Sequence, residues 1–72
     1  MRGKIRISLD EKLQKLRMTR YELSKLTEIK YQTIDNYYKN RVVRYDSEIL
    51  LKICLALDCP IGDIIKIEER EP

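Results

Sequence analysis

The chain has 72 residues, of which 43% are hydrophobic, and its formal net charge is +3. This length allows a single small domain, residues 1–72, with a modest core and marginal stability. The hydrophobic fraction is too high for a disordered chain, and no apolar run approaches the length of a transmembrane helix. The N-terminus also lacks a signal-peptide pattern, so we expect a soluble, cytoplasmic protein.

Cysteine and histidine usage argues against metal chemistry. The chain has two cysteines and no histidine, so a four-ligand zinc site built from Cys and His is excluded. A disulfide between Cys54 and Cys59 is an open alternative, but we favour a core residue on a helix for Cys54 and a partly buried loop residue for Cys59. The chain also has no glycine-rich phosphate loop, and its carboxylates are scattered. We therefore expect no metal, no cofactor and no enzymatic activity.

The charges are distributed unevenly along the chain. Residues 1–44 hold twelve Lys and Arg against five Asp and Glu, a net charge of +7. Residues 45–72 hold three against seven, a net charge of −4. A basic face with an acidic remainder suits a polyanion bound on one side, although a solvated surface with chance asymmetry is the alternative.

The first elements in chain order are a strand and two helices. Residues 3–8 alternate polar and apolar side chains, which predicts a short strand. From residue 9 the period becomes helical, and three leucines fall on one face: Leu9, Leu13 and Leu16. Thr19 and Glu22 form a capping-box pattern that starts a second helix, which runs to about Thr27 with Leu23 and Leu26 directed inward.

Residues 30–39 are predicted to form a third, amphipathic helix. Its apolar face contains Ile34, Tyr37 and Tyr38, which are spaced i, i+3 and i+4. The opposite face carries side chains that hydrogen-bond well to flat polar edges: Tyr31, Gln32, Asp35, Asn36 and Lys39. This segment is therefore a helix built to expose a polar surface.

The remainder is predicted to contain two more helices and a second strand. Asn40 fits a left-handed helix C-cap, and Asp46 is the expected N-cap of a helix from Ser47 to about Leu57. That helix is apolar nearly all round, which predicts a central core position or an interface. Pro60 ends it, and a short fifth helix, a strand-like piece through Ile65 and Ile67, and a frayed tail over residues 69–72 follow.

The two terminal strands are expected to pair with each other. Neither can satisfy its backbone alone, so we predict an antiparallel pair within the chain, with pairing across a dimer as the alternative. The pair is expected to cover the helical core with four isoleucines: Ile5, Ile7, Ile65 and Ile67. The helical core itself is predicted to contain Leu16, Leu23, Leu26, Ile34, Leu50, Ile53 and Leu57.

From Thr19 to Ile64 the sequence resembles the Cro/C1-type, or XRE, family of helix-turn-helix regulators. The resemblance rests on Thr19, Leu23, Ser24, Ile29 and Ile34, and on the later segment "ICLALDCPIGDII". It implies an all-α, five-helix, lambda-repressor-like DNA-binding domain with a helix-turn-helix motif at about residues 19–38. The chain departs from the family pattern at four positions: Ser24 replaces Ala, Glu28 replaces Gly, Lys30 replaces a capping Ser or Thr, and Tyr38 replaces Glu.

The resemblance implies sequence-specific binding of double-stranded DNA, with helix 30–39 in the major groove. Gln and Asn can each match a base edge bidentately, preferably adenine, so the expected base contacts are Tyr31, Gln32 and Asn36. The expected phosphate contacts are Thr19, Arg20, Lys30, Thr33, Lys39, Arg41 and Arg44. We expect a transcriptional repressor that forms a homodimer at least on DNA, through exposed apolar residues such as Ile49 or Leu55. The alternative is a protein-interaction module, such as an antitoxin or phage-type regulator.

Overall fold

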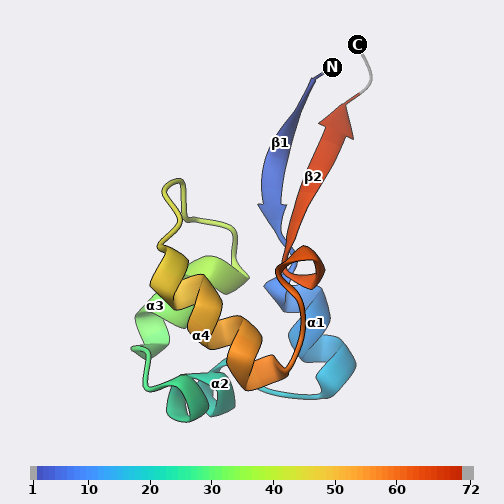
Figure 1. The fold of residues 1–72 in the computed structure, drawn as a ribbon. Helices are drawn as coiled ribbons and strands as arrows, with labels where there is room; N and C mark the ends of the chain where they lie inside the picture. Colours follow the sequence, from blue (N-terminus) through green and yellow to red (C-terminus); the bar gives the residue numbers. More distant parts are fainter. Residues whose placement is uncertain (1, 71–72) are drawn as a thin grey trace.

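A computed structural model describes residues 2–70 of the chain. In chain order its elements are β1 (Arg2–Ile7), α1 (Leu9–Leu16), α2 (Arg20–Thr27), α3 (Tyr31–Tyr38), α4 (Ser47–Leu57), a 3-10 turn η1 (Ile61–Asp63) and β2 (Ile65–Arg70). The four α-helices form one body, and the two strands form a ribbon that projects from it (Figure 1). No helix in this part of the chain is long and apolar enough to cross a membrane.

The helix starts and stops follow local signals in the sequence. Thr19 caps α2 as predicted, because its hydroxyl accepts from the Glu22 amide and the Glu22 carboxylate accepts from the Thr19 amide. Asp46 caps α4 by accepting from two backbone amides of its first turn. Every α-helix is followed by a non-glycine residue with positive φ: Arg17, Glu28, Asn40 and Asp58.

The predicted fifth helix is not found in residues 2–70. The chain makes one 3-10 turn, Ile61–Asp63, and then enters β2. Pro60 precedes this turn and Gly62 lies within it, and glycine is a poor helix former, so the segment has little intrinsic support for a longer helix. β2 also extends through Glu69 and Arg70, so the predicted frayed tail is wrong for these two residues, while residues 71–72 lie outside the described part.

The core lies between the helices and the base of the ribbon. Its buried apolar residues are Ile7, Leu9, Leu13, Leu23, Ile29, Ile34, Tyr37, Ile53, Cys54, Leu57 and Ile64. This confirms Leu23, Ile34, Ile53 and Leu57 from the predicted core, and Leu50 packs against the core while remaining half-buried.

The predictions for Leu16 and Leu26 were wrong, because both side chains are exposed. Leu16 lies in the last turn of α1, and Met18 packs against the core two residues later. In α2 the inward position after Leu23 is taken by Thr27, whose hydroxyl donates to the Leu23 carbonyl at 2.7 Å. Helical periodicity gave the correct faces, but the neighbouring elements decided which turn of each face is covered.

The terminal strands pair within the chain, as predicted. β1 and β2 are antiparallel, with Ile7 opposite Ile65 and Ile5 opposite Ile67. Only the pair at the base approaches the helices, where Ile7 is fully buried; Ile5 and Ile67 remain exposed, so the prediction that all four isoleucines cover the core was wrong. The reason is the direction of the ribbon, which leads away from the helices (Figure 1).

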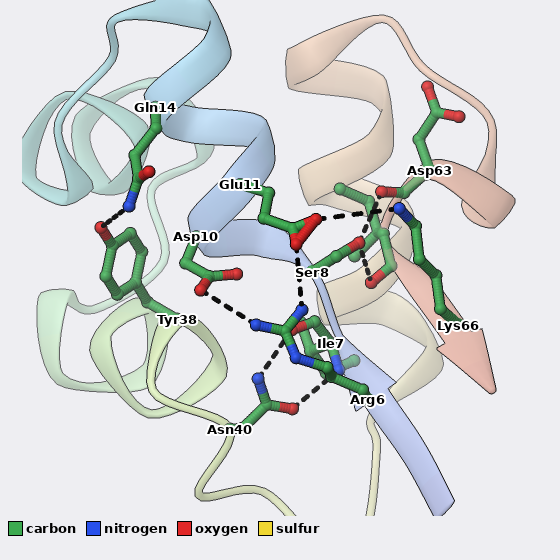
Figure 2. Close-up of polar contacts among 11 residues, drawn as sticks. Arg6, Ile7, Ser8, Asp10, Glu11, Gln14, Tyr38, Asn40, Asp63 and Lys66 are labelled. Atoms are coloured by element: carbon green, nitrogen blue, oxygen red, sulfur yellow. Dashed lines mark hydrogen bonds and ion pairs between the residues drawn. The ribbon is translucent and has the colours of Figure 1, made fainter. Parts of the chain in front are cut away.

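Two polar side chains fasten the base of the ribbon to the helices (Figure 2). The Asn40 side chain, after α3, accepts from the Ile7 amide and donates to the Ile7 carbonyl, both at 2.7 Å. The buried Ser8 hydroxyl donates to the carbonyls of Asp63 and Ile64 at 2.8 and 3.1 Å. The Asn40 side chain and the backbone just before β2 are therefore tied to two consecutive residues at the end of β1, Ile7 and Ser8.

Candidate nucleic-acid interface

Helices α2 and α3 pack against each other, and the turn that joins them contains no glycine. Glu28 occupies the left-handed region, with φ of 60°. Such a residue costs on the order of 1 kcal/mol relative to glycine. Two neighbouring hydroxyls hold the turn: Ser24 donates to the Ile29 carbonyl at 2.7 Å, and Thr27 accepts from the Ile29 amide at 3.3 Å. Two departures from the family pattern thus concern the same turn: Glu28 lies in it, and Ser24 of α2 helps to fix it through its hydroxyl.

The outer face of α3 presents a pair of amide side chains, of which Gln32 is exposed and Asn36 is half-buried. Gln32 and Asn36 are one helical turn apart, and the Gln32 side-chain amide donates to Asn36 Oδ1 at 3.1 Å. Tyr31 is exposed beside them, and Thr33 lies half-buried at the flank. Lys30 precedes the helix and provides no side-chain cap. The structure therefore brings the three predicted base-reading residues to one solvent-facing surface.

Asp35 is buried beneath this surface and connects α2 to α3. Its carboxylate accepts a hydrogen bond from Arg20 of α2 and forms an ion pair of 3.2 Å with Lys39. The Arg20 guanidinium also lies over the Tyr38 ring, 4.5 Å from its centroid. Burial raises the pKa of Asp35, but Lys39 and Arg20 outweigh this effect and lower the pKa below its ordinary value of 3.8. Asp35 is therefore held as an anion that fixes Arg20 beside the α3 face.

The other predicted cationic contacts lie at the ends of α3. Lys30 is exposed before the helix, and Lys39, Arg41 and Arg44 are exposed after it. Thr19 is exposed at the N-terminus of α2. Lys30 flanks the N-terminus of α3 and the other three cations follow its C-terminus, so positive charge lies at both ends of the helix.

The family model described as Cro/C1-type HTH DNA-binding domain matches residues 8–70. The chain belongs to this family. A search of curated proteins found no match. Because the family is a DNA-binding one, this XRE-type chain is a DNA-binding regulator.

Sequence reasoning missed the connection that orients Arg20 in this Cro/C1-type domain. The sequence predicted Asp35 on the exposed polar face of α3, but its side chain is buried, because it pairs with Arg20, fifteen residues away on another helix. The Gln14 amide, which donates to the Tyr38 hydroxyl at 3.4 Å, was also missed (Figure 2). No periodicity or spacing in the sequence identifies such pairs between helices.

Within residues 2–70, no three His, Cys, Asp or Glu side chains are grouped so that they could hold a metal ion. Both cysteines are free, with Cys54 buried and Cys59 half-buried. Burial, with a further effect of Cys59, raises the pKa of the Cys54 thiol. The assignment of both cysteines as packing residues is confirmed.

Proposed function

We propose that this protein is a sequence-specific transcriptional repressor that binds double-stranded DNA as a homodimer and inserts α3 into the major groove. The observation that carries the proposal is the hydrogen-bonded Gln32–Asn36 pair on the outer face of α3, with cations at both ends of the helix and the Arg20–Asp35 contact beneath it. A major groove admits an α-helix, and amide side chains can pair with base edges there.

The amide pair retains the groups that base reading needs. One Gln32 N–H is used by Asn36 Oδ1, which leaves both Asn36 N–H donors and the Gln32 carbonyl oxygen available. Donors and an acceptor at adjacent positions match the pattern of adenine, which presents N7 and the N6 amino group in the major groove. Tyr31 adds an aromatic ring at the same surface, suited to a thymine methyl group or a phosphate.

Phosphate contacts would set the position of α3. We assign them to Thr19 and Arg20 at the start of α2, to Lys30 and Thr33, and to the cations after α3: Lys39, Arg41 and Arg44. The N-terminus of α2 contributes amide donors and a favourable dipole for an anion. Because these contacts carry no base information, they would provide the salt-dependent part of the affinity. Repression would then require only occupancy of the operator.

A selection of bound sequences from random duplexes tests the proposal directly. A palindromic consensus is expected, because two copies related by a twofold axis read two half-sites. Failure to enrich any sequence, together with salt-insensitive capture of a protein partner, would instead support the protein-interaction alternative.

Two classes of variant then separate base readers from phosphate contacts. Gln32→Ala and Asn36→Ala should each weaken the selected site by about 1–3 kcal/mol and leave scrambled DNA little changed. Arg44→Ala is the matched control: it should weaken both duplexes alike and reduce the salt slope by about one. Equal losses on both duplexes for Gln32→Ala would show that this residue does not read bases.

A further inference from the structure

The β1–β2 ribbon extends well beyond the helices (Figure 1). Each strand has six residues, so the ribbon is about 20 Å long at about 3.3 Å per residue. Ile7 is buried at its base, whereas Lys4, Ile5 and Ile67 farther along are exposed. Packing against the core therefore accounts for the base of the ribbon but does not explain its outer part.

The side chains of the ribbon are divided by chemistry between its two faces. Directly opposite residues project to the same face, and successive residues along a strand project to opposite faces. The exposed pair Ile5 and Ile67 therefore lies on one face. The other face carries three cations and one carboxylate, a net charge of +2: Lys4, Arg6, Lys66 and Glu68. This charged face suits an anionic partner.

The edge of β1 faces the loop that joins α3 to α4. Between them lies a depression of about 180 Å³, whose walls include Lys4 and Arg6 of β1, Glu68 of β2, and Asn40 and Tyr45 of the loop. The two cations of the loop, Arg41 and Arg44, are exposed, and both are assigned above to phosphate contacts. Lys4 therefore lies across a depression from the loop that carries these contacts.

The ribbon is also held in a fixed relation to α3. The two hydrogen bonds of 2.7 Å from the Asn40 side chain to Ile7 join the base of the ribbon to the C-terminal end of α3. The α3–α4 loop and the ribbon lie on the same side of the helical body (Figure 1). When α3 occupies a major groove, the ribbon therefore leaves the helices beside the cations that follow α3.

Lys4 is the cation of this edge best placed to meet a phosphate. Arg6 is half-buried and forms ion pairs with Asp10 and Glu11 of α1, at 3.2 and 3.6 Å. Lys4 is exposed and lies opposite Glu68, whose carboxylate would repel a phosphate at the same place. Lys4 and Glu68 are therefore expected to have opposite effects on the binding of DNA.

We propose that the β1 edge of the ribbon, through Lys4, binds the sugar–phosphate backbone of DNA beside the groove that α3 occupies. The inference rests on the proposed function, because α3 must lie in the groove for the ribbon to reach the flanking backbone. A ribbon of about 20 Å spans about six base pairs at about 3.4 Å each, so it would lengthen the contact with DNA without reading bases.

Salt titrations of binding to a random duplex of about 30 base pairs test this contact. Lys4→Gln should reduce the slope of log K against log salt by about one and weaken binding about 5–10-fold at about 0.1 M salt. Lys4→Arg should retain the wild-type slope, because it retains the charge. Glu68→Gln should strengthen binding, because it removes the opposing carboxylate. Thermal melts check that each variant remains folded.

The matched control is Lys66→Gln, which removes the same charge from the other strand of the ribbon. Lys66 is exposed but borders a different depression, formed with residues of α1 such as Glu11 and Lys12. This variant should keep the wild-type slope. A wild-type slope for Lys4→Gln would overturn the inference. Equal losses for Lys4→Gln and Lys66→Gln would also overturn it, because they would show only a general effect of net charge.

The same titrations separate this inference from the proposed function. If random duplexes are bound and Lys4→Gln loses the contact, but a selection enriches no sequence, the ribbon contact stands and sequence-specific regulation fails. If a sequence is enriched and Lys4→Gln binds it with the wild-type slope, the ribbon inference fails alone. Absence of binding to any duplex would overturn both.

Discussion

The Asn40 side chain should contribute a substantial part of the fold's stability. It makes two hydrogen bonds of 2.7 Å to Ile7, a residue with no exposed surface. Asn40→Gly retains the positive φ without strain and removes only the side chain. Two hydrogen bonds contribute about 1 kcal/mol each, and leaving the Ile7 amide and carbonyl unpaired adds to the loss, so we expect about 2–4 kcal/mol.

Thermal unfolding followed by circular dichroism measures this effect. At about 4–8 °C per kcal/mol for a domain of this size, the midpoint should fall by roughly 10–30 °C. Val43→Gly introduces the same flexible residue in the same loop at a position that is 89% exposed, so it should change the midpoint only slightly. Equal midpoints for Asn40→Gly and Val43→Gly would refute the idea that Asn40 secures the strand.

Three further predictions concern the core, the stability of the fold at low pH, and the ribbon. Ile53→Ala should cost roughly 2–5 kcal/mol in denaturant unfolding because Ile53 is fully buried, whereas exposed Leu51→Ala should cost much less; similar losses would contradict the described packing. Because the pKa of Asp35 is lowered on folding, its stabilisation is complete above pH 3.8 and is lost as the pH falls through the lower folded value. Asp35→Asn should therefore reduce the dependence of the free energy of unfolding on pH in that range. An unchanged pH dependence would argue against this role. Deletion of residues 1–6 should lower the thermal midpoint, and an unchanged melt would mean that the ribbon does not support the fold.

Features encoded within a few residues could be predicted from the sequence. Thr19 and Glu22 specify the start of α2 within one turn, and Asp46 does the same for α4. The polar face of α3 follows from the i, i+4 spacing of Gln32 and Asn36, which is why their side-chain contact lies where the pattern indicates. These elements required no knowledge of tertiary structure.

Features that depend on distant partners could not be predicted in this way. The left-handed conformation of Asn40 was expected, but its bonds to Ile7 join residues 33 positions apart. The same limit applies to Arg20 and Asp35, which belong to different helices. For Leu16 the periodic pattern identified the correct helix face. It could not predict that the packed part of this face ends before Leu16.

The pairing of β1 with β2 also has a kinetic consequence. Arg2 lies opposite Arg70 and Ile7 opposite Ile65, so the ribbon forms only when nearly the whole chain has been closed into a loop. Contacts of such sequence separation slow folding, because the entropy of loop closure is lost before the contacts form. A circular permutant that joins residues 2 and 70 by a short linker and opens at the exposed Val43 would convert the ribbon into a local hairpin. Such a chain should fold faster than the natural order while keeping the same helices.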